Sequence, residues 1–214
     1  MQKGICTAWE ALCFNDGSRD STGKIMDEFA ARDPHYRVFH HDSPRNLGGC
    51  YKRGIGLSSM NFLMLITGDN ECRVDSVRML LSEAGTADMI IPFTVNLKAR
   101  KFLRRWLSRL FLGGVNFLSG VRLRYYNGTV VHRTKLVREV PLRTDGFGYQ
   151  AELLVKMARA GHTFKELGIE VDHREKGASK AFRWKNLLST AAFFLFLAWD
   201  AGPFRSRKNR SSSR

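Results

Sequence analysis

Two short clusters of polar residues in the first half of the chain could bind a cation or a phosphorylated ligand. One is NDGSRD at 15–20, after the apolar run 11–14, and the other is TGDNE at 67–71, after the apolar run 62–66. Aspartate and glycine are ordinary turn formers, so either cluster alone is weak evidence of a site. Together they offer several carboxylates, whose oxygens are the ligands that hard divalent cations prefer.

The elements that would bring the two clusters together are the strands of a parallel sheet. Hydrophobic period and turn residues predict strands at 11–14, 36–40 and 62–66, with helices between them. The first helix begins after Asp20 or Ser21, the second covers 48–59, and the apolar strand 62–66 is expected to be buried on both faces. Ligands bind at the carboxyl ends of such strands, so we expect both clusters to face one crevice.

The charge of the chain is unevenly distributed. The formal net charge of the 214 residues is +15, yet residues 1–95 carry 10 Lys and Arg against 12 Asp and Glu, whereas residues 96–214 carry 25 against 8. A hydrophobic content of 43% excludes a disordered chain and favours one domain with an appendage. The basic half indicates an anionic partner, which could be nucleic acid, anionic lipid or a phosphorylated small molecule.

Apolar side chains are interleaved with the cations in the basic half. The amphipathic segment 97–112 fits either a surface helix or a helix lying on a membrane. The region 187–204 contains the apolar run LLSTAAFFLFLAW, which is shorter than the about 20 residues of a spanning helix and predicts a core helix or one docked on an anionic membrane surface. Residues 205–214 resemble a disordered basic tail. The chain lacks zinc-ligand spacing and an RNP-like strand, so we expect no nucleic acid partner.

Five motifs together resemble family 2 glycosyltransferases of the GT-A fold, and most of all the dolichol-phosphate mannosyltransferase-like branch. That branch moves a sugar from a nucleotide sugar onto a polyprenyl phosphate. The resemblance implies an α/β fold over residues 1–186, with a mostly parallel, Rossmann-like sheet flanked by helices and a C-terminal amphipathic or apolar helix. The motifs, in the family's order, are FNDGSRDST at 14–22, NLGG at 46–49, TGDNE at 67–71, QAE at 150–152 and REKGASK at 174–180.

The resemblance implies a nucleotide-sugar site in the acidic half of the chain. Asp16 matches the family carboxylate that accepts a hydrogen bond from the base of a UDP- or GDP-linked sugar, and a carboxylate suits the N–H edge of uracil or guanine. The resemblance assigns Asn15, Ser18, Asp20 and Asn46 to the same site. Asp20 is expected to support the loop or to cap the following helix.

Asp69 is the strongest single candidate, as a ligand of Mg²⁺ or Mn²⁺, as a donor-binding residue and as a catalytic residue. A metal ion would neutralise the diphosphate that leaves during sugar transfer. The family's Asp-x-Asp motif aligns with 67–69 or with 69–71, and both alignments keep Asp69 and Glu71 at the metal. Thr67 is then a structural residue or a hydrogen-bond partner of the ligand.

The acceptor is expected to bind the basic half. A polyprenyl phosphate is already anionic, so it needs a phosphate clamp more than a strong base. Arg174, Ser179 and Lys180 match the family's phosphate-binding residues, and Arg174 is also assigned as catalytic. Glu152 falls at the family's acidic position beneath the acceptor cleft and is assigned as a catalytic acid, base or orienting residue. In-line attack would invert the anomeric centre, with the cations acting by positioning and charge stabilisation.

Two features depart from the family pattern. Only residues 1–10 precede the first predicted strand, so the family's first strand has no counterpart, and Arg124 and Val130 replace the family's Asp and Arg. The alternatives are a family 2 enzyme that acts on a polysaccharide or other glycan, an inactive fragment, and a basic nucleic-acid-binding protein. The expected location is cytoplasmic, peripheral at the cytoplasmic face of a membrane, with all four cysteines reduced.

Overall fold

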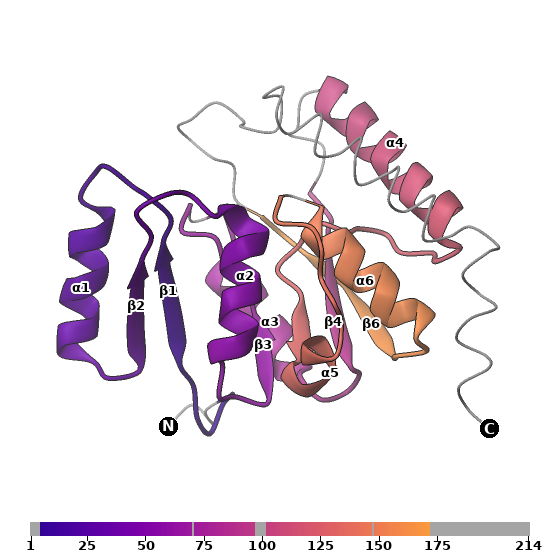
Figure 1. Cartoon of the computed structure of the whole chain (residues 1–214). Coiled ribbons are helices and arrows are strands. Elements are labelled where there is room, and N and C mark those ends of the chain that lie inside the picture. Colours follow the sequence, from indigo (N-terminus) through magenta and orange to yellow (C-terminus); the bar gives the residue numbers. More distant parts are fainter. Residues whose placement is uncertain (1–4, 70, 97–101, 147, 172–214) are drawn as a thin grey trace.

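A computed structural model describes residues 5–69, 71–96, 102–146 and 148–171 (Figure 1). Strands and helices alternate through much of the chain, which confirms the predicted α/β class. The described elements are β1 (Ala11–Asn15), α1 (Thr22–Arg32), β2 (Tyr36–His40), α2 (Asn46–Leu57), β3 (Phe62–Met64), α3 (Val74–Ser82), β4 (Met89–Thr94), α4 (Phe102–Ser119), β5 (Val131–Arg133), α5 (Thr134–Arg138), α6 (Tyr149–Arg159) and β6 (Phe164–Ile169).

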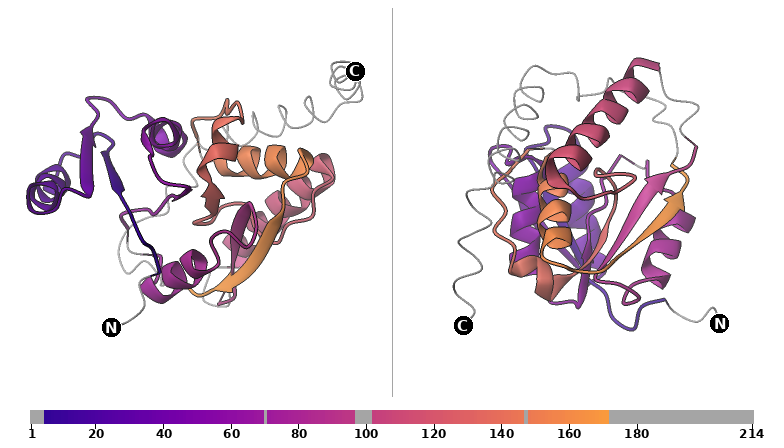
Figure 2. Two further views of the ribbon diagram at one scale, coloured as in Figure 1. Left: turned by 90° about the horizontal axis from the view of Figure 1, so that it is seen from below. Right: turned by 90° about the vertical axis from the view of Figure 1, so that its right-hand side faces the viewer.

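The described strands form two sheets, so the prediction of a single continuous sheet is wrong. β1 and β2 pair in parallel, with Ala11 opposite Tyr36 and Asn15 opposite His40. The second sheet has the order β3-β5-β4-β6, and β5 runs antiparallel to β3 and β4, while β6 runs parallel to β4. Within the described residues no strand pairs with both β1 and β3, and each of them has one edge without a partner strand. Figures 1 and 2 place α1, β1 and β2 at one end of the molecule, with α2 between them and the second sheet.

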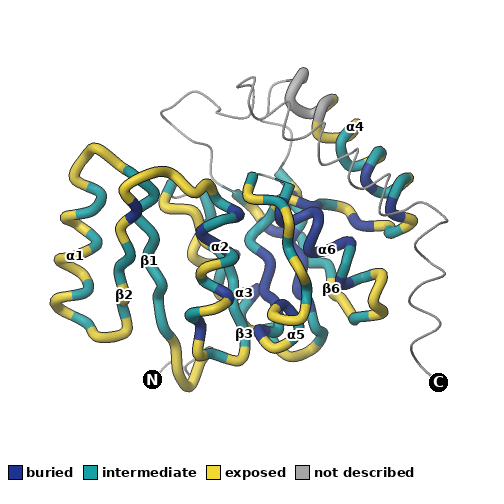
Figure 3. The backbone as a smooth tube through the Cα atoms, in the orientation of Figure 1, coloured by how far each residue is buried: buried dark blue, intermediate teal, exposed yellow. Residues whose placement is uncertain are grey.

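The hydrophobic core lies around the second sheet. Leu153, Leu154 and Met157 of α6 are fully buried there, together with Ile91 of β4 and Val115 of α4. By contrast, no described residue from 5 to 40 is buried, and the tube in Figure 3 turns dark blue first at the end of β2. The N-terminal βαβ unit therefore depends on contacts with the rest of the fold more than on a core of its own.

The strand predicted at 62–66 is shorter and more exposed than expected. β3 ends at Met64, its three residues are only half-buried, and the side chain of Ile66 is half-exposed. The reason is that β3 pairs with β5 on one edge only, so it borders the second sheet instead of lying inside it.

The amphipathic helix predicted in the basic half is confirmed as α4, from Phe102 onward. Residues 97–101, and with them the start of the predicted segment, lie outside the described residues, as do the REKGASK loop, the 187–204 region and the basic tail. None of the described helices has the length and apolar character that crossing a membrane would need. All four cysteines are free.

A glycine allows α2 to approach the loop that precedes α6. The Gly48 N–H donates a hydrogen bond of 2.9 Å to the carbonyl oxygen of Asp145. A Cβ on Gly48 would lie 2.7 Å from that oxygen and 2.8 Å from the carbonyl oxygen of Thr144. One turn later, the Lys52 ammonium forms an ion pair with the Asp145 carboxylate. These contacts join the N-terminal unit to the second sheet and its helices.

We predict that Gly48→Ala destabilises the fold, because its Cβ would collide with backbone atoms of residues 144 and 145 that cannot rotate away. The expected loss is about 1–3 kcal/mol of unfolding free energy, measured by urea denaturation. The control is Gly56→Ala in the same helix, whose Cβ would meet nothing within 4 Å. That variant should be neutral or more stable by up to about 1 kcal/mol. Equal unfolding free energies of the two variants would contradict the close-approach argument.

Candidate functional site

The Asp16 carboxylate joins the end of β1 to the loop that opens α2. Its Oδ1 accepts hydrogen bonds from the backbone N–H of Arg45 at 2.7 Å and from His41 Nδ1 at 3.0 Å, and its Oδ2 accepts one from the backbone N–H of Asn46 at 2.9 Å. Partial burial alone would raise the pKa of Asp16, but these hydrogen bonds and a further one from the Cys50 thiol stabilise the charged form and outweigh burial, so the pKa is lowered. The carboxylate is therefore ionised at neutral pH.

Asn46, the first residue of α2, has a φ of 62°, in the left-handed region. Asparagine tolerates this conformation better than most residues do. The structure links Asn46 to Asp16 through its backbone N–H, and the sequence had assigned it to the nucleotide site without distinguishing backbone from side chain.

A buried cluster behind Asp16 fixes the orientation of the carboxylate. The His41 side chain is 2% exposed, and the Arg53 guanidinium lies 2.8 Å from its Nε2. A guanidinium can only donate, so Nε2 accepts and the ring proton lies on Nδ1, which donates to Asp16. The Cys50 Sγ lies 3.9 Å from the same Nδ1.

Asp16, His41 and Cys50 form the one trio of possible metal ligands in the described parts of the chain. A thiol and an imidazole do not suit Mg²⁺ or Mn²⁺, which prefer oxygen ligands. The Arg53 cation, which faces the imidazole, would also repel a metal ion. Burial, followed by the charge of Asp16, raises the pKa of the Cys50 thiol to about 11, so no thiolate is available. We therefore assign this trio a positioning role.

The remaining residues of the 15–20 cluster shape the turn after β1. Asn15 Oδ1 accepts a 3.0 Å hydrogen bond from the backbone N–H of Ser18, and Gly17 between them has a φ of 79°. Asp20 Oδ1 accepts a 3.0 Å bond from the backbone N–H of Thr22, the first residue of α1. Asp20 therefore supports the loop, which is one of its two expected roles, whereas the N-cap position of α1 is Ser21 and no side-chain hydrogen bond caps the helix. A nucleotide contact by Asn15, Ser18 or Asp20 stays a prediction.

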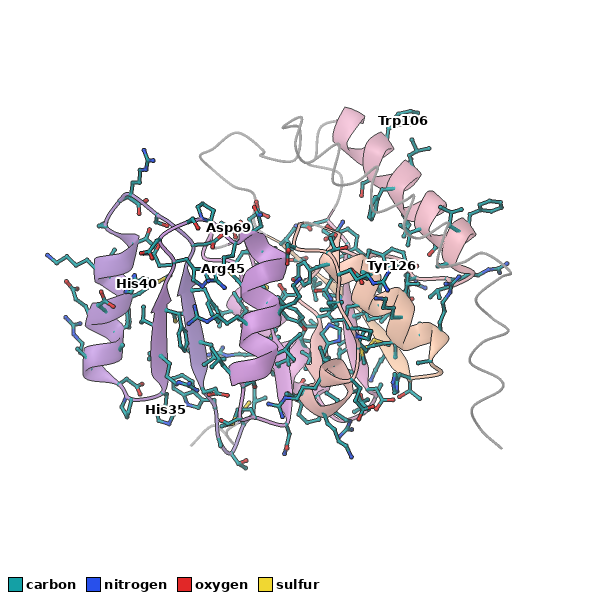
Figure 4. The ribbon with its side chains drawn as sticks, viewed as in Figure 1. His35, His40, Arg45, Asp69, Trp106 and Tyr126 are labelled. Carbon is teal, nitrogen blue, oxygen red and sulfur yellow. The ribbon has the colours of Figure 1, made fainter. Side chains whose placement is uncertain are left out.

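The Asp69 loop follows β3. Thr67 Oγ1 donates a 2.7 Å hydrogen bond to Asp69 Oδ1, and the backbone N–H of Glu71 lies 3.4 Å from the same oxygen. The expected partnership of Thr67 with Asp69 is confirmed. Asp69 and Glu71 contribute two carboxylates from one loop, and this oxygen donor set fits Mg²⁺ or Mn²⁺. Figure 4 shows Asp69 and Arg45 at the same end of the molecule, toward which β1 and β2 point.

An open pocket of about 670 Å³ lies beside the Asp16 carboxylate. The sequence did not single out its three cations, Arg45, Lys52 and Arg53, which suit an anionic ligand. Their spacing over about two turns at the start of a glycine-containing helix was the one signal in the sequence that could have indicated them. The lining residues are Pro44, Arg45, Asn46, Gly49, Lys52, Arg53 and Asp145.

Glu152 is placed to orient the loop at the wall of this pocket. Its side chain is 1% exposed and accepts hydrogen bonds from the backbone N–H groups of Arg143 at 2.9 Å and Thr144 at 2.8 Å, and from Lys156 Nζ at 2.5 Å. Burial alone would raise the pKa of Glu152, but these donors lower it overall. The geometry supports the orienting alternative, and a role as catalytic acid or base stays a prediction. Arg174, Ser179 and Lys180 lie outside the described residues.

Comparisons with known proteins show similar sequences and a similar fold. The family model described as glycosyl transferase family 2 matches residues 3–143. An undecaprenyl-phosphate mannosyltransferase of Micrococcus luteus is 28% identical over 80% of this chain and 75% of its own length. A polyprenol monophosphomannose synthase of Mycolicibacterium smegmatis is 28% identical over 82% of this chain and 71% of its own. The fold is similar to that of glucosyl-3-phosphoglycerate synthase from Mycobacterium tuberculosis in complex with Mg²⁺ and uridine diphosphate, with a TM-score of 0.63, 17% identity and coverage of 89% of this chain and 68% of that one.

We predict that Asp16→Asn destabilises the protein, because an amide NH₂ would face at least one of the N–H donors that the carboxylate now accepts. The expected loss is about 1–3 kcal/mol of unfolding free energy, measured by urea denaturation at pH 7. The matched control is Asp20→Asn in the same loop, because Asn can still accept the single bond from Thr22. Its unfolding midpoint should match that of the wild type. An unchanged midpoint for Asp16→Asn would contradict the anchoring role.

Proposed function

The chain belongs to glycosyl transferase family 2, and we propose that it transfers a sugar from a nucleotide-diphosphate sugar to a polyprenyl phosphate at a membrane surface. The observation that carries the proposal is the cationic pocket beside the Asp16 carboxylate at the carboxyl ends of β1 and β2. The Asp69 loop follows β3 at the same end of the molecule (Figure 4). The two relatives named for undecaprenyl-phosphate and polyprenol substrates support a polyprenyl phosphate as the acceptor.

The donor would bind between charged groups of both signs. Asp16 would accept a hydrogen bond from the base, and Arg45, Lys52 and Arg53 would lie near the negative charge of the diphosphate. Asp69 and Glu71 would hold a Mg²⁺ or Mn²⁺ ion, which when bound supplies positive charge to the departing diphosphate. The complex of the structural neighbour with Mg²⁺ and uridine diphosphate supports this reading.

The acceptor phosphate would bind Arg174, Ser179 and Lys180, which the sequence places in one cationic loop. An oxygen of the acceptor phosphate forms the new bond to the anomeric carbon, the bond from that carbon to the diphosphate breaks, and the nucleoside diphosphate leaves with the electron pair. In-line displacement inverts the anomeric centre. The polyprenyl phosphate carries no proton that must be removed, so the cations act by position and charge. Glu152 contributes by orienting the loop that carries Asp145.

Helix α4 supports docking of the enzyme on a membrane. Trp106, Leu110 and Phe117 are 53%, 59% and 87% exposed, and at 100° per residue they lie within about 40° of one another on one face of the helix. Val115, on the opposite face, is fully buried in the core. A surface helix needs only one apolar face, so a second, exposed apolar face favours contact with lipid.

The same helix also carries an exposed cation, Arg109. Figure 1 shows α4 at the end of the molecule toward which β1 and β2 point, and Figure 4 shows Trp106 pointing away from the sheets.

We predict that Asp69→Ala weakens the Mn²⁺-dependent binding of nucleotide by about tenfold or more, because it removes a carboxylate ligand of the ion. Isothermal titration with UDP and with GDP, each with and without MnCl₂, measures the effect. The control is Asp75→Ala in the first turn of α3, an exposed carboxylate that should leave the affinities unchanged. If Mn²⁺ increases the nucleotide affinity of Asp69→Ala as much as that of the wild type, the assignment of Asp69 as a metal ligand is refuted.

We also predict that the double substitution Trp106→Ser and Phe117→Ser reduces binding to vesicles of mixed phosphatidylcholine and phosphatidylglycerol by about tenfold or more, because two large apolar side chains no longer enter the lipid. Co-sedimentation measures the bound fraction. Phe29→Ser is the matched control, because Phe29 is a half-exposed aromatic residue on α1, at the other end of the molecule. Full vesicle binding by the double variant would exclude α4 as the docking face.

A further inference from the structure

We propose that Asn96 is a positioning residue for the Asp69 loop, which it reaches through the two residues that follow β6. The inference rests on the proposed function, because it takes Asp69 and Glu71 as the metal ligands. It deepens that function by naming the side chain that holds their loop in place. Asn96 lies two residues beyond the end of β4.

The Asp69 loop receives little support from its own strand. β3 ends at Met64 and pairs with β5 on one edge only, so the loop begins beyond the last paired residue. The hydrogen bond from Thr67 to Asp69 lies within the loop and does not tie it to the rest of the fold. A divalent ion needs its ligands at fixed distances, so contacts from outside the loop must set its position.

Glu170 and Val171, directly after β6, provide such contacts, and we call them the β6 exit. Cys72, the residue after Glu71, forms an isolated antiparallel bridge with Val171. Ser76 Oγ, in the first turn of α3, donates a 2.9 Å hydrogen bond to the carbonyl oxygen of Glu170. The end of the Asp69 loop and the start of α3 are therefore both attached to the β6 exit.

Asn96 holds the β6 exit where the backbone pairing stops. The parallel pairing of β4 and β6 ends with Thr94 opposite Ile169, so Asn96 and Val171 fall opposite each other two positions further on. Asn96 Oδ1 accepts a 3.3 Å hydrogen bond from the Val171 N–H, and Asn96 Nδ2 donates a 2.8 Å bond to the Val171 carbonyl oxygen. A carboxamide carries both an acceptor and a donor, so one side chain binds both backbone groups of Val171.

The two hydrogen bonds act at a partly buried position. Val171 packs against the apolar cluster that contains Leu80 and Ile169. Without the Asn96 carboxamide, the Val171 N–H and C=O would lose these partners, and the β6 exit would shift relative to β4. The bridge to Cys72 would pass that shift to Glu71, its neighbour in the chain.

The test is the Mn²⁺ enhancement, the ratio of the dissociation constants without and with MnCl₂ for whichever of UDP and GDP binds more tightly. Isothermal titration measures it on the full chain. Asn96→Ala removes both hydrogen bonds and should reduce the enhancement by about fivefold or more. Asn96→Asp keeps the size of the side chain but sets an anionic oxygen against the Val171 carbonyl, so a similar reduction is expected. The affinity without Mn²⁺ should stay unchanged, because Asn96 does not line the cationic pocket.

Asn61→Ala is the matched control, because Asn61 is exposed and contacts Thr134 through its backbone carbonyl. Its Mn²⁺ enhancement should equal that of the wild type. A substitution that merely unfolds part of the sample lowers the fraction of protein that binds and leaves the ratio unchanged, so the ratio separates positioning from stability.

Amide hydrogen exchange tests the contact between Asn96 and Val171 without any nucleotide. In the wild type the Val171 N–H should be protected although it lies beyond β6, and in Asn96→Ala it should exchange at least about tenfold faster. Exchange of this amide in the wild type at the rate of an unstructured peptide would overturn the role of Asn96, even if both variants fail to fold.

Each titration result decides a different claim. An unchanged Mn²⁺ enhancement in folded Asn96→Ala and Asn96→Asp would overturn the inference and leave the proposed function intact. Failure of Mn²⁺ to enhance nucleotide binding by the wild type would overturn the metal assignment, and failure of both nucleotides to bind would overturn the proposed function itself. The inference falls with either of these.

Discussion

The site depends on one partly buried carboxylate. Asp16, at the end of β1, accepts hydrogen bonds from His41, just after β2, and from the two residues that open α2. This arrangement explains why Asn46 adopts a left-handed conformation, since that turn directs its N–H at Oδ2. It also explains why the buried His41 carries its proton on Nδ1, since Arg53 donates to Nε2. The three hydrogen bonds offset the desolvation of the carboxylate and give the pocket one rigid wall.

The position of Asp145 in the pocket wall depends on a second carboxylate, which is fully buried. Glu152 holds the backbone of residues 143 and 144, and the next residue, Asp145, meets Gly48 and Lys52 of α2. Because the N-terminal unit buries no described residue before His41, its position relative to the second sheet rests on such polar contacts and on the α2 residues Tyr51 and Ile55, which reach the main core. The proposed donor pocket therefore lies where α2 meets the loop that carries Asp145.

Local features of this fold could be predicted from the sequence, and features that depend on distant contacts could not. The strand at 36–40, the turn at Asp20 and the bond from Thr67 to Asp69 arise from neighbouring residues. The position of β3 at a sheet edge depends on which strands pair, which no local pattern encodes. His41 and the pocket cations were missed because their partners are distant in the sequence. The fold brings His41 to Asp16 and Lys52 to Asp145.

A crystal structure of the protein with UDP and MnCl₂ tests the central claim most directly. We expect the base to lie at Asp16 while the hydrogen bonds from His41, Arg45 and Asn46 stay in place. We also expect the diphosphate to lie near the pocket cations and Mn²⁺ to bind Asp69 and Glu71. A nucleotide bound away from Asp16, or a Mn²⁺ ion bound without Asp69, would contradict the account.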